Sequence, residues 1–144
     1  MAITSAICNS FKVEILTATH NFTASSGNTF NLALYTSSAT LSKSTTAYTT
    51  SNEVASSGGY TAKGKALTSV TPVLSTDTAV CDFANVSWTS ASFTSRGCLI
   101  FNDSAASDQS VCAIDFGGDK TVTSGTFTIE FPAATAGNAI IGIA

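Results

Sequence analysis

Apolar and polar side chains alternate with a period of two along most of the chain, and this limits the fold to one built from strands. Residues 126–131 show the pattern most clearly, because Phe127, Ile129 and Phe131 alternate with threonine and glutamate. Successive side chains of a strand point to opposite faces of a sheet, so this period predicts a half-buried strand. Pro132 ends the strand, since proline cannot donate a ladder hydrogen bond. The sequence therefore predicts an all-β fold.

Turn residues divide the chain into about eight segments of this kind. The strand at 93–102 ends in a continuous apolar run, which predicts a central position with both faces covered. The parity slips near Ala84 and Asn85, which predicts a β-bulge, and Gly117–Asp119 predicts a turn. This number and spacing of strands are typical of a β-sandwich or jelly roll. The expected strands lie at 29–36, 60–70, 78–88, 93–102, 109–116, 126–131 and 138–144, with an edge or corner piece at 72–74.

One segment near the N-terminus has a different period. Between residues 5 and 20, the apolar residues Ile7, Phe11, Ile15 and Leu16 recur at helical spacing. This spacing puts them on one face of a helix, with polar residues toward the other side. The sequence therefore predicts one N-terminal amphipathic helix.

A second segment, 37–59, has no apolar run and is rich in serine and threonine. We expect an ordered loop excursion over the surface, anchored by Leu41, Tyr48 and Val54, with local disorder as the alternative. A chain of 144 residues has the size of one domain. We therefore expect a single domain over 1–144, in which residues 29–144 form the sandwich.

The charge content limits the partners of the chain. Charged residues make up only 10% of it, and the formal net charge is −3. Binding to phosphate backbones needs clustered lysine and arginine, so we do not expect nucleic acid as a partner. No run of about 18 apolar residues exists, so we do not expect a membrane-spanning helix. A surface of serine and threonine repels its neighbours only weakly, which favours close contact with other subunits.

The four cysteines have no metal-binding spacing. The start of the chain lacks a basic region followed by a long apolar stretch, so we expect no secretory signal and a protein made in the cytoplasm. In that compartment cysteines stay reduced. If residues 93–116 form a hairpin, Cys98 and Cys112 are near neighbours across it. A disulfide would fit such a position, and so would two packed thiols, which we expect.

Residues that could carry chemistry are few and scattered. His20 is the single histidine, and no nucleophile motif surrounds it, so we interpret it as a polar residue at a helix end. The aspartates of residues 103–119 flank expected turns and lack the spacing of a calcium loop. Arg96 is expected either in an interfacial ion pair or as a solvated strand residue. We expect no enzymatic activity, no catalytic residue, no metal and no cofactor.

Short motifs spread over the whole chain resemble those of a known family. They are Cys8–Phe11, Leu32–Ser37, Thr46–Thr49, Asn52–Val54, Gly59–Ala62, Val86–Trp88, Phe93–Gly97, Ile114–Lys120, Gly125–Pro132 and Asn138–Ile141. In this order they resemble the small virion proteins of tailed bacteriophages. The resemblance implies a cement (decoration) protein on the capsid or, more loosely, a tail protein, and it implies no catalytic residues.

These observations predict a virion protein that binds the major capsid protein on the outer capsid surface and stabilises the shell. A homotrimer would match the threefold positions of a capsid. The alternative is a tail tip or fibre component that binds the host surface through the excursion. Candidate subunit or capsid contacts are Ile7, Phe11, Ile15, Leu16, Tyr48, Tyr60, Arg96, Ile140, Ile141 and Ile143. The apolar members of this set are equally compatible with a place in the core.

Overall fold

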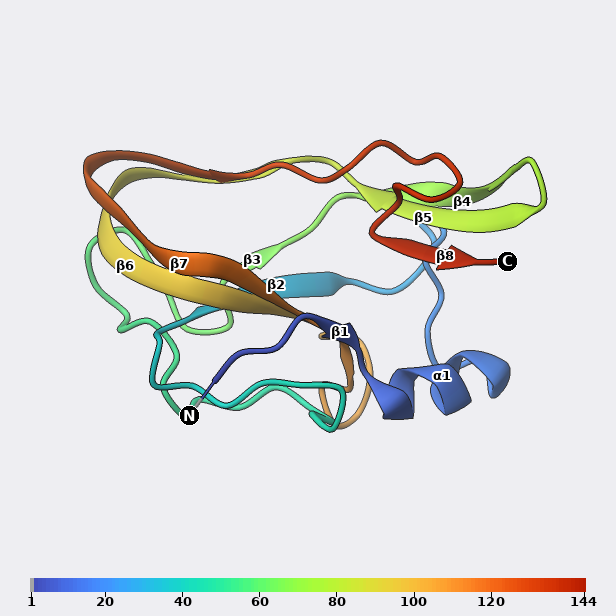
Figure 1. The fold of residues 1–144 in the computed structure, drawn as a ribbon, viewed down its shortest axis with the longest axis horizontal. Helices are drawn as coiled ribbons and strands as arrows, with labels where there is room; N and C mark the ends of the chain where they lie inside the picture. The colour runs from blue at the N-terminus through green and yellow to red at the C-terminus, as the bar shows by residue number, and fades with distance from the viewer. Residues whose placement is uncertain (1) are drawn as a thin grey trace.

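The computed structural model describes residues 2–144 and consists of two antiparallel sheets with one short helix (Figure 1). The larger sheet has the strand order β1-β7-β6-β2-β3, and the smaller has the order β4-β5-β8. The expected all-β, sandwich-like architecture with an N-terminal helix is confirmed. The elements are β1 (Ala6–Ile7), α1 (Asn9–Leu16), β2 (Phe30–Tyr35), β3 (Lys65–Ala66), β4 (Ser69–Ser75), β5 (Thr78–Phe83), β6 (Val86–Asn102), β7 (Ser110–Ile129) and β8 (Ile141–Ile143).

A single long hairpin of β6 and β7 organises the molecule. Its pairing begins at Phe101↔Ser110 and continues to Val86↔Ile129. The register shifts around Ala91, and bulges of this kind bend a strand and increase its twist. Figure 1 shows the hairpin curving back above itself at this point. We call residues 93–102 and 110–122 the β2 arm, because β6 pairs with β2 within it at residues 97–102, and residues 86–91 and 125–129 the return arm.

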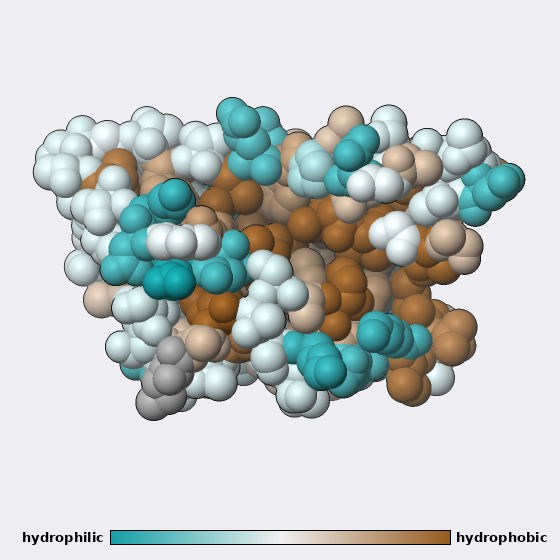
Figure 2. Space-filling model, viewed as in Figure 1, coloured by the Kyte–Doolittle hydropathy of each residue, from teal (hydrophilic) through white to brown (hydrophobic). Residues whose placement is uncertain are grey.

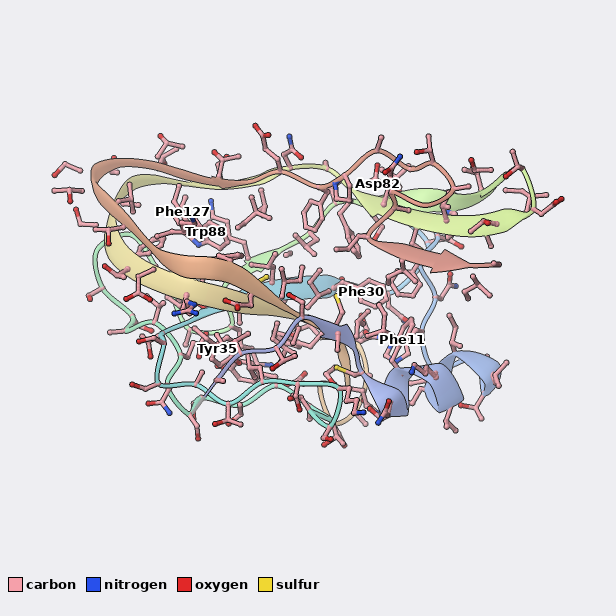
Figure 3. All side chains as sticks on the ribbon, viewed as in Figure 1. Phe11, Phe30, Tyr35, Asp82, Trp88 and Phe127 are labelled. Carbon is pink, nitrogen blue, oxygen red and sulfur yellow. The ribbon has the colours of Figure 1, made fainter. Side chains whose placement is uncertain are left out.

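Both faces of the β2 arm are buried at residues 97–102, where it pairs with β2, as the apolar run in β6 predicts. Leu32 and Ile100 face the main core, which also contains Trp88 from the return arm. The alternate residues of the same two strands, among them Tyr35 and Leu99, face a second cluster, which the excursion covers. Figure 3 shows Tyr35 and Trp88 on opposite sides of the sheet. Alternate side chains of β2 and β6 therefore pack into two separate cores on the two faces of the sheet.

The helix is shorter than the expected span 5–20. Ile7 belongs to β1, where it pairs with Cys112, so it is not a helical residue. The helix ends at Leu16, and Ala18 has a positive φ of 60°, which an α-helix does not allow. Phe11 is the only buried residue within it. The excursion at 37–59 is ordered, and its backbone is tied to β2 through Val54 N and Leu34 O.

Several strand predictions need correction. The expected strand 60–70 is wrong for its first half, because Lys63 and Gly64 have positive φ and form a turn before β3. Ala84 and Asn85 do not form a bulge within one strand; they link β5 of the small sheet to β6 of the large one. The expected strands 78–88 and 93–102 are therefore replaced by β5, which ends at Phe83, and by β6, which begins at Val86.

The expected turn at Gly117–Asp119 is also wrong, because β7 runs through it. The pairs Ser95↔Lys120 and Gly97↔Asp115 leave residues 116–119 opposite Arg96 alone. Residues 116–119 form a large irregular bulge instead of a reversal, with Gly117 at φ 80°. The expected strands 109–116 and 126–131 are consequently two parts of one strand that ends at Ile129.

The cysteines form no disulfide: all four are free and buried. Cys98 lies opposite Ile114 and Cys112 lies opposite Ile100, so the two thiols are diagonal neighbours. Burial raises the pKa of Cys112 to about 12, with a smaller contribution from Cys8. Packed thiols are the alternative that the structure supports.

Candidate functional site

An open apolar groove of about 620 Å³ lies between the two arms of β7. Its apolar walls come from residues that are all partly buried, and Figure 2 shows apolar surface across the middle of this face. These residues are Ile114, Phe116, Val122, Phe127, Ile129, Phe131 and Ile140. Because several large apolar side chains are left without a complete cover, this groove is the main candidate for a binding site.

Aromatic rings form the floor of the groove. Phe127 lies 5.2 Å from Phe93 and 6.3 Å from Phe116, measured between ring centroids. Its ring also meets Trp88 edge-on at 6.1 Å. Since Trp88 is buried in the main core, the floor is supported by rigid packing beneath it.

The groove adjoins a free strand edge. In the sheet, β7 lies between β6 and β1, but β1 pairs only with Ala113 and Cys112. One residue pair further, the Asp115 amide donates to the Ser5 hydroxyl. Beyond Asp115, the outer edge of β7 pairs with no other strand of residues 2–144. A groove beside a free edge can hold an extended chain, whose backbone adds to the sheet while its side chains enter the groove.

Polar groups surround the groove without forming an acid–base site. Lys120 and Glu130 are its charged lining residues, and neither makes an ion pair within residues 2–144. The remaining polar lining consists of threonines. The described part of the chain also holds no cluster of metal-ligating side chains and no helix long and apolar enough to cross a membrane. The chemistry of the groove is therefore that of an apolar contact with a charged rim.

The candidate contact residues fall into separate groups. Leu16 and Ile143 are exposed, at 86% and 51% of their surface. Ile140 lines the groove. Phe11 and Ile141 are buried in the main core, and Ile7 and Ile15 pack against it half-buried. The apolar candidates thus divide between surface and core, and the sequence pattern alone left both open.

Arg96 forms an ion pair within the chain, with its Nε 3.0 Å from Asp115 Oδ1. The pair spans the bulge of β7, where the Gly117 amide donates to the same oxygen at 3.0 Å. The Gly117 amide, and then Arg96, hold the pKa of Asp115 below its usual value. Arg96 thus holds the strand bend next to the groove.

Tyr48 and Tyr60 both bind Glu53 within the chain. The Tyr60 hydroxyl donates to Glu53 Oε1 at 2.6 Å and accepts from the Leu34 amide at 2.9 Å. The Tyr48 hydroxyl donates to Glu53 Oε2 at 2.5 Å, and the Lys63 amide donates to Oε1 at 2.7 Å. Burial, then the bond to Glu53, raises the pKa of Tyr48 to about 12. These tyrosines hold the excursion against β2.

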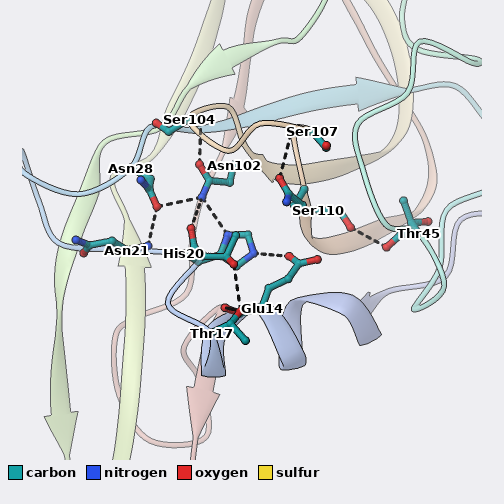
Figure 4. A network of polar contacts seen from close by, with 12 residues as sticks. Glu14, Thr17, His20, Asn21, Asn28, Thr45, Asn102, Ser104, Ser107 and Ser110 are labelled. Carbon is teal, nitrogen blue, oxygen red and sulfur yellow. Dashed lines mark hydrogen bonds and ion pairs between the residues drawn. The ribbon is translucent and has the colours of Figure 1, made fainter.

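His20 connects the helix to the sheet (Figure 4). Its Nε2 lies 2.6 Å from Glu14 Oε2, and its Nδ1 lies 3.1 Å from Asn102 Nδ2. Since Asn102 Oδ1 accepts from the Ser104 backbone amide, Asn102 Nδ2 faces the ring and donates to His20 Nδ1. The imidazole is buried with no hydroxyl or thiol on either nitrogen, so this arrangement anchors α1.

Sequence reasoning did not find the groove. It assigned Phe127, Ile129 and Phe131 to the inner face of a strand, and they do lie on one face, but that face is only half covered. A signal was present in the second apolar group on the same strand, which contains Ile114 and Phe116. Comparison of the chain with protein-family models, curated proteins and solved structures found no match.

Proposed function

We propose that the protein is a structural component of a bacteriophage virion that decorates the capsid, binds the major capsid protein on its outer surface and stabilises the shell. The observation that supports this best is the apolar groove beside the free edge of β7. A groove with a strand edge recognises an extended protein segment, which is how neighbouring subunits of an assembly commonly meet.

The rigid packing of the folded domain supports the same role. The sheet between the two clusters is packed on both faces, and the excursion is tied down by the Glu53 contacts. A rigid body keeps its contact surfaces in fixed geometry, which reduces the entropy lost on binding. The sequence motifs resemble those of phage virion proteins, and this resemblance is the reason for proposing that the assembly is a phage particle.

The first test is the copy number of the chain in purified particles of the phage that encodes it. Quantitative mass spectrometry against the major capsid protein should give a copy number comparable to that of the capsid protein. A handful of copies per particle would overturn the capsid role and favour a tail tip or fibre component.

The second test is the stability of the shell. Particles that lack the protein should lose their DNA at a lower temperature than complete ones, and adding purified protein should restore resistance. The double variant Leu16→Ser/Ile143→Ser tests the two exposed candidate contacts and should restore it less well. If particles with and without the protein break at the same temperature, the stabilising role is wrong.

A further inference from the structure

We propose that the groove along β7 receives strand β4 of a second copy of this chain, so that copies associate head to tail. This inference rests on the proposed docking role of the groove and names its occupant as a neighbouring copy, which leaves the exposed Leu16 and Ile143 to contact the capsid protein. It is carried by the shape, polarity and charge of the two surfaces.

Strand β4 is an exposed apolar edge. It ends the small sheet, so one of its edges pairs with no other strand of residues 2–144, although the Ala24 and Ala136 amides donate hydrogen bonds to its Thr71 and Ser75 hydroxyls. Val70, Val73 and Leu74 are exposed at 44%, 54% and 71% of their surface, although they sit in a strand. The strand Ser69–Ser75 contains no charged residue, and its one proline, Pro72, lies where the register with β5 shifts. Edge strands are usually protected by charge, by proline, by a bulge or by a covering segment. Pro72 and the register shift protect only the middle of this strand, so the exposed apolar side chains on either side of Pro72 are the part that a partner would cover.

The groove has the complementary features. It has a free strand edge, where β4 could form a new ladder, and apolar walls, where alternate side chains of β4 would fit. The lengths agree, because β4 has seven residues and the upper wall is the run 126–132. Val73 and Leu74 are consecutive and point to opposite faces, so one of them enters the groove in either orientation.

Charge complementarity supports the pairing of these two surfaces. Asp77 is exposed in the turn at the end of β4, and Lys120 is exposed on the rim of the groove. Neither makes an ion pair within residues 2–144. With β4 seated so that its turn reaches the β2 arm, Asp77 of one copy meets Lys120 of the next.

The symmetry of the contact follows from its two different halves. Because β4 and the groove are distinct surfaces, each copy offers one of each, and the contact is heterologous. Heterologous contacts close into rings or extend into filaments. A closed ring of three copies would suit a threefold position on a capsid.

Two complementary variants test this contact in solution. The double variant Val73→Asp/Leu74→Asp changes the residue that enters the groove in either orientation and leaves the groove intact, whereas Phe127→Asp blocks the groove and leaves β4. Light scattering with size-exclusion chromatography should show the wild type as an oligomer, and each variant should dissociate at least about tenfold more readily, given the apolar area lost. Mixed in equal amounts, the variants should form a 1:1 dimer, because only one productive contact remains.

The other arrangements give different results. If β4 pairs with β4, Phe127→Asp alone stays dimeric. If groove meets groove, the Val73→Asp/Leu74→Asp variant alone stays dimeric. A wild type that is monomeric at about 1 mM, where even a millimolar contact is populated, overturns the proposal. Val13→Asp on α1 is the matched control, since Val13 is 64% exposed and lies outside both surfaces, and it should leave the oligomer unchanged.

A charge reversal keeps the test independent of folding. Lys120→Asp should weaken the oligomer by up to about fivefold, as expected for an exposed ion pair, and adding Asp77→Lys should restore it. Failure of the double variant to recover would contradict the seating of β4 with its turn toward the β2 arm. These measurements use the purified protein alone. A monomer that still decorates capsids would therefore overturn this inference and leave the proposed function standing.

Discussion

Glu53 shows how a single side chain can order a long polar segment. Its carboxylate accepts from two tyrosine hydroxyls and one backbone amide, and it lies within the turn-rich stretch that precedes β3. Hydrogen bonds to a charged group are stronger than neutral ones, so this carboxylate compensates for the missing apolar residues. Sequence reasoning named Tyr48 as an anchor of the excursion but gave Glu53 no role, because nothing in the local pattern distinguishes it from a solvated glutamate.

Replacing Glu53 with alanine should destabilise the protein by on the order of 3 kcal/mol, because three donors lose their acceptor together. Urea denaturation followed by tryptophan fluorescence measures this change. Glu130→Ala is the control, since that carboxylate makes no ion pair within residues 2–144, and it should change stability by less than about 0.5 kcal/mol. Equal effects of the two substitutions would show that Glu53 does not hold the excursion.

The tyrosines also predict a loss of stability in alkali. Their ordinary pKa is 10.0, and in the folded protein burial raises the pKa of Tyr48 to about 12 and that of Tyr60 further. Above pH 10 the unfolded chain releases tyrosine protons that the folded chain keeps, so the free energy of unfolding falls as pH rises from about 10 to 12.

Denaturation midpoints measured across this pH range give the slope. Tyr48→Phe should lower the slope, because it removes one of the groups that titrate differently in the two states. A slope that is unchanged in this variant would contradict the assignment. Below pH 10 the contribution of these protons is complete, so stability there should not depend on them.

At the scale of elements, turns and bends decide how the strands are divided. The tightest of these is at Gly64, where a Cβ would lie 1.8 Å from the Leu32 carbonyl oxygen and φ is +66°. Only glycine fits both conditions, since the backbone of β2 leaves no room and the left-handed region disfavours other residues. The turn that follows Tyr60 is therefore pressed directly onto the central sheet.

The substitution Gly64→Ala should cost about 3 kcal/mol of folding free energy, from overlap with the backbone of β2 and from the left-handed conformation. Gly118→Ala is a matched control, because a Cβ there has nothing within 4 Å. It should stay within about 1 kcal/mol of the wild type. Thermal denaturation of both variants checks the difference, and similar melting temperatures would contradict this reading of the turn.

Element boundaries were predicted well where one period persists and poorly where the chain bends. The run Cys98–Phe101 indicated a central strand, and it lies between two cores. Gly117 and Gly118 indicated a turn, because glycine is common both where a chain reverses and where a strand bulges. Which of the two forms depends on the pairing partner across the sheet, and a single strand does not contain that information.

At the scale of the molecule, stability should be distributed unevenly. The β2 arm is buried on both faces where it pairs with β2. Strand β4 is exposed on both faces and pairs with β5 alone, with two further hydrogen bonds from the Ala24 and Ala136 amides to its side chains. Hydrogen exchange measured by mass spectrometry on dilute protein should therefore be slowest in β2 and in residues 97–102, and fastest in β4 and residues 131–140. Protection of β4 that increases with protein concentration would agree with its coverage by a second copy, and strong protection at every concentration would contradict it.

The prediction for the whole molecule was correct for the class of fold but did not include the groove. A period of two assigns Phe127 to an inner face, but whether a further layer covers that face depends on where the hairpin bends. The bend results from several register shifts whose residues include Ala91 and Phe93, and these are ordinary strand residues in the sequence. The candidate site is therefore a property of the assembled sheets.

The uncharged edge of β4 has a consequence for how the protein must be handled by the cell that makes it. An apolar strand with an open edge templates the addition of further strands, and net repulsion between copies is weak at a charge of −3. If copies associate through β4 as proposed, those that have not yet assembled are therefore prone to aggregate as they accumulate. A lysine of the kind that protects many such edges would improve solubility, and it would also spoil the strand that a neighbour needs. Timing of synthesis, matched to the supply of assembly sites, would then add to the partial protection that Pro72 and the register shift give the strand.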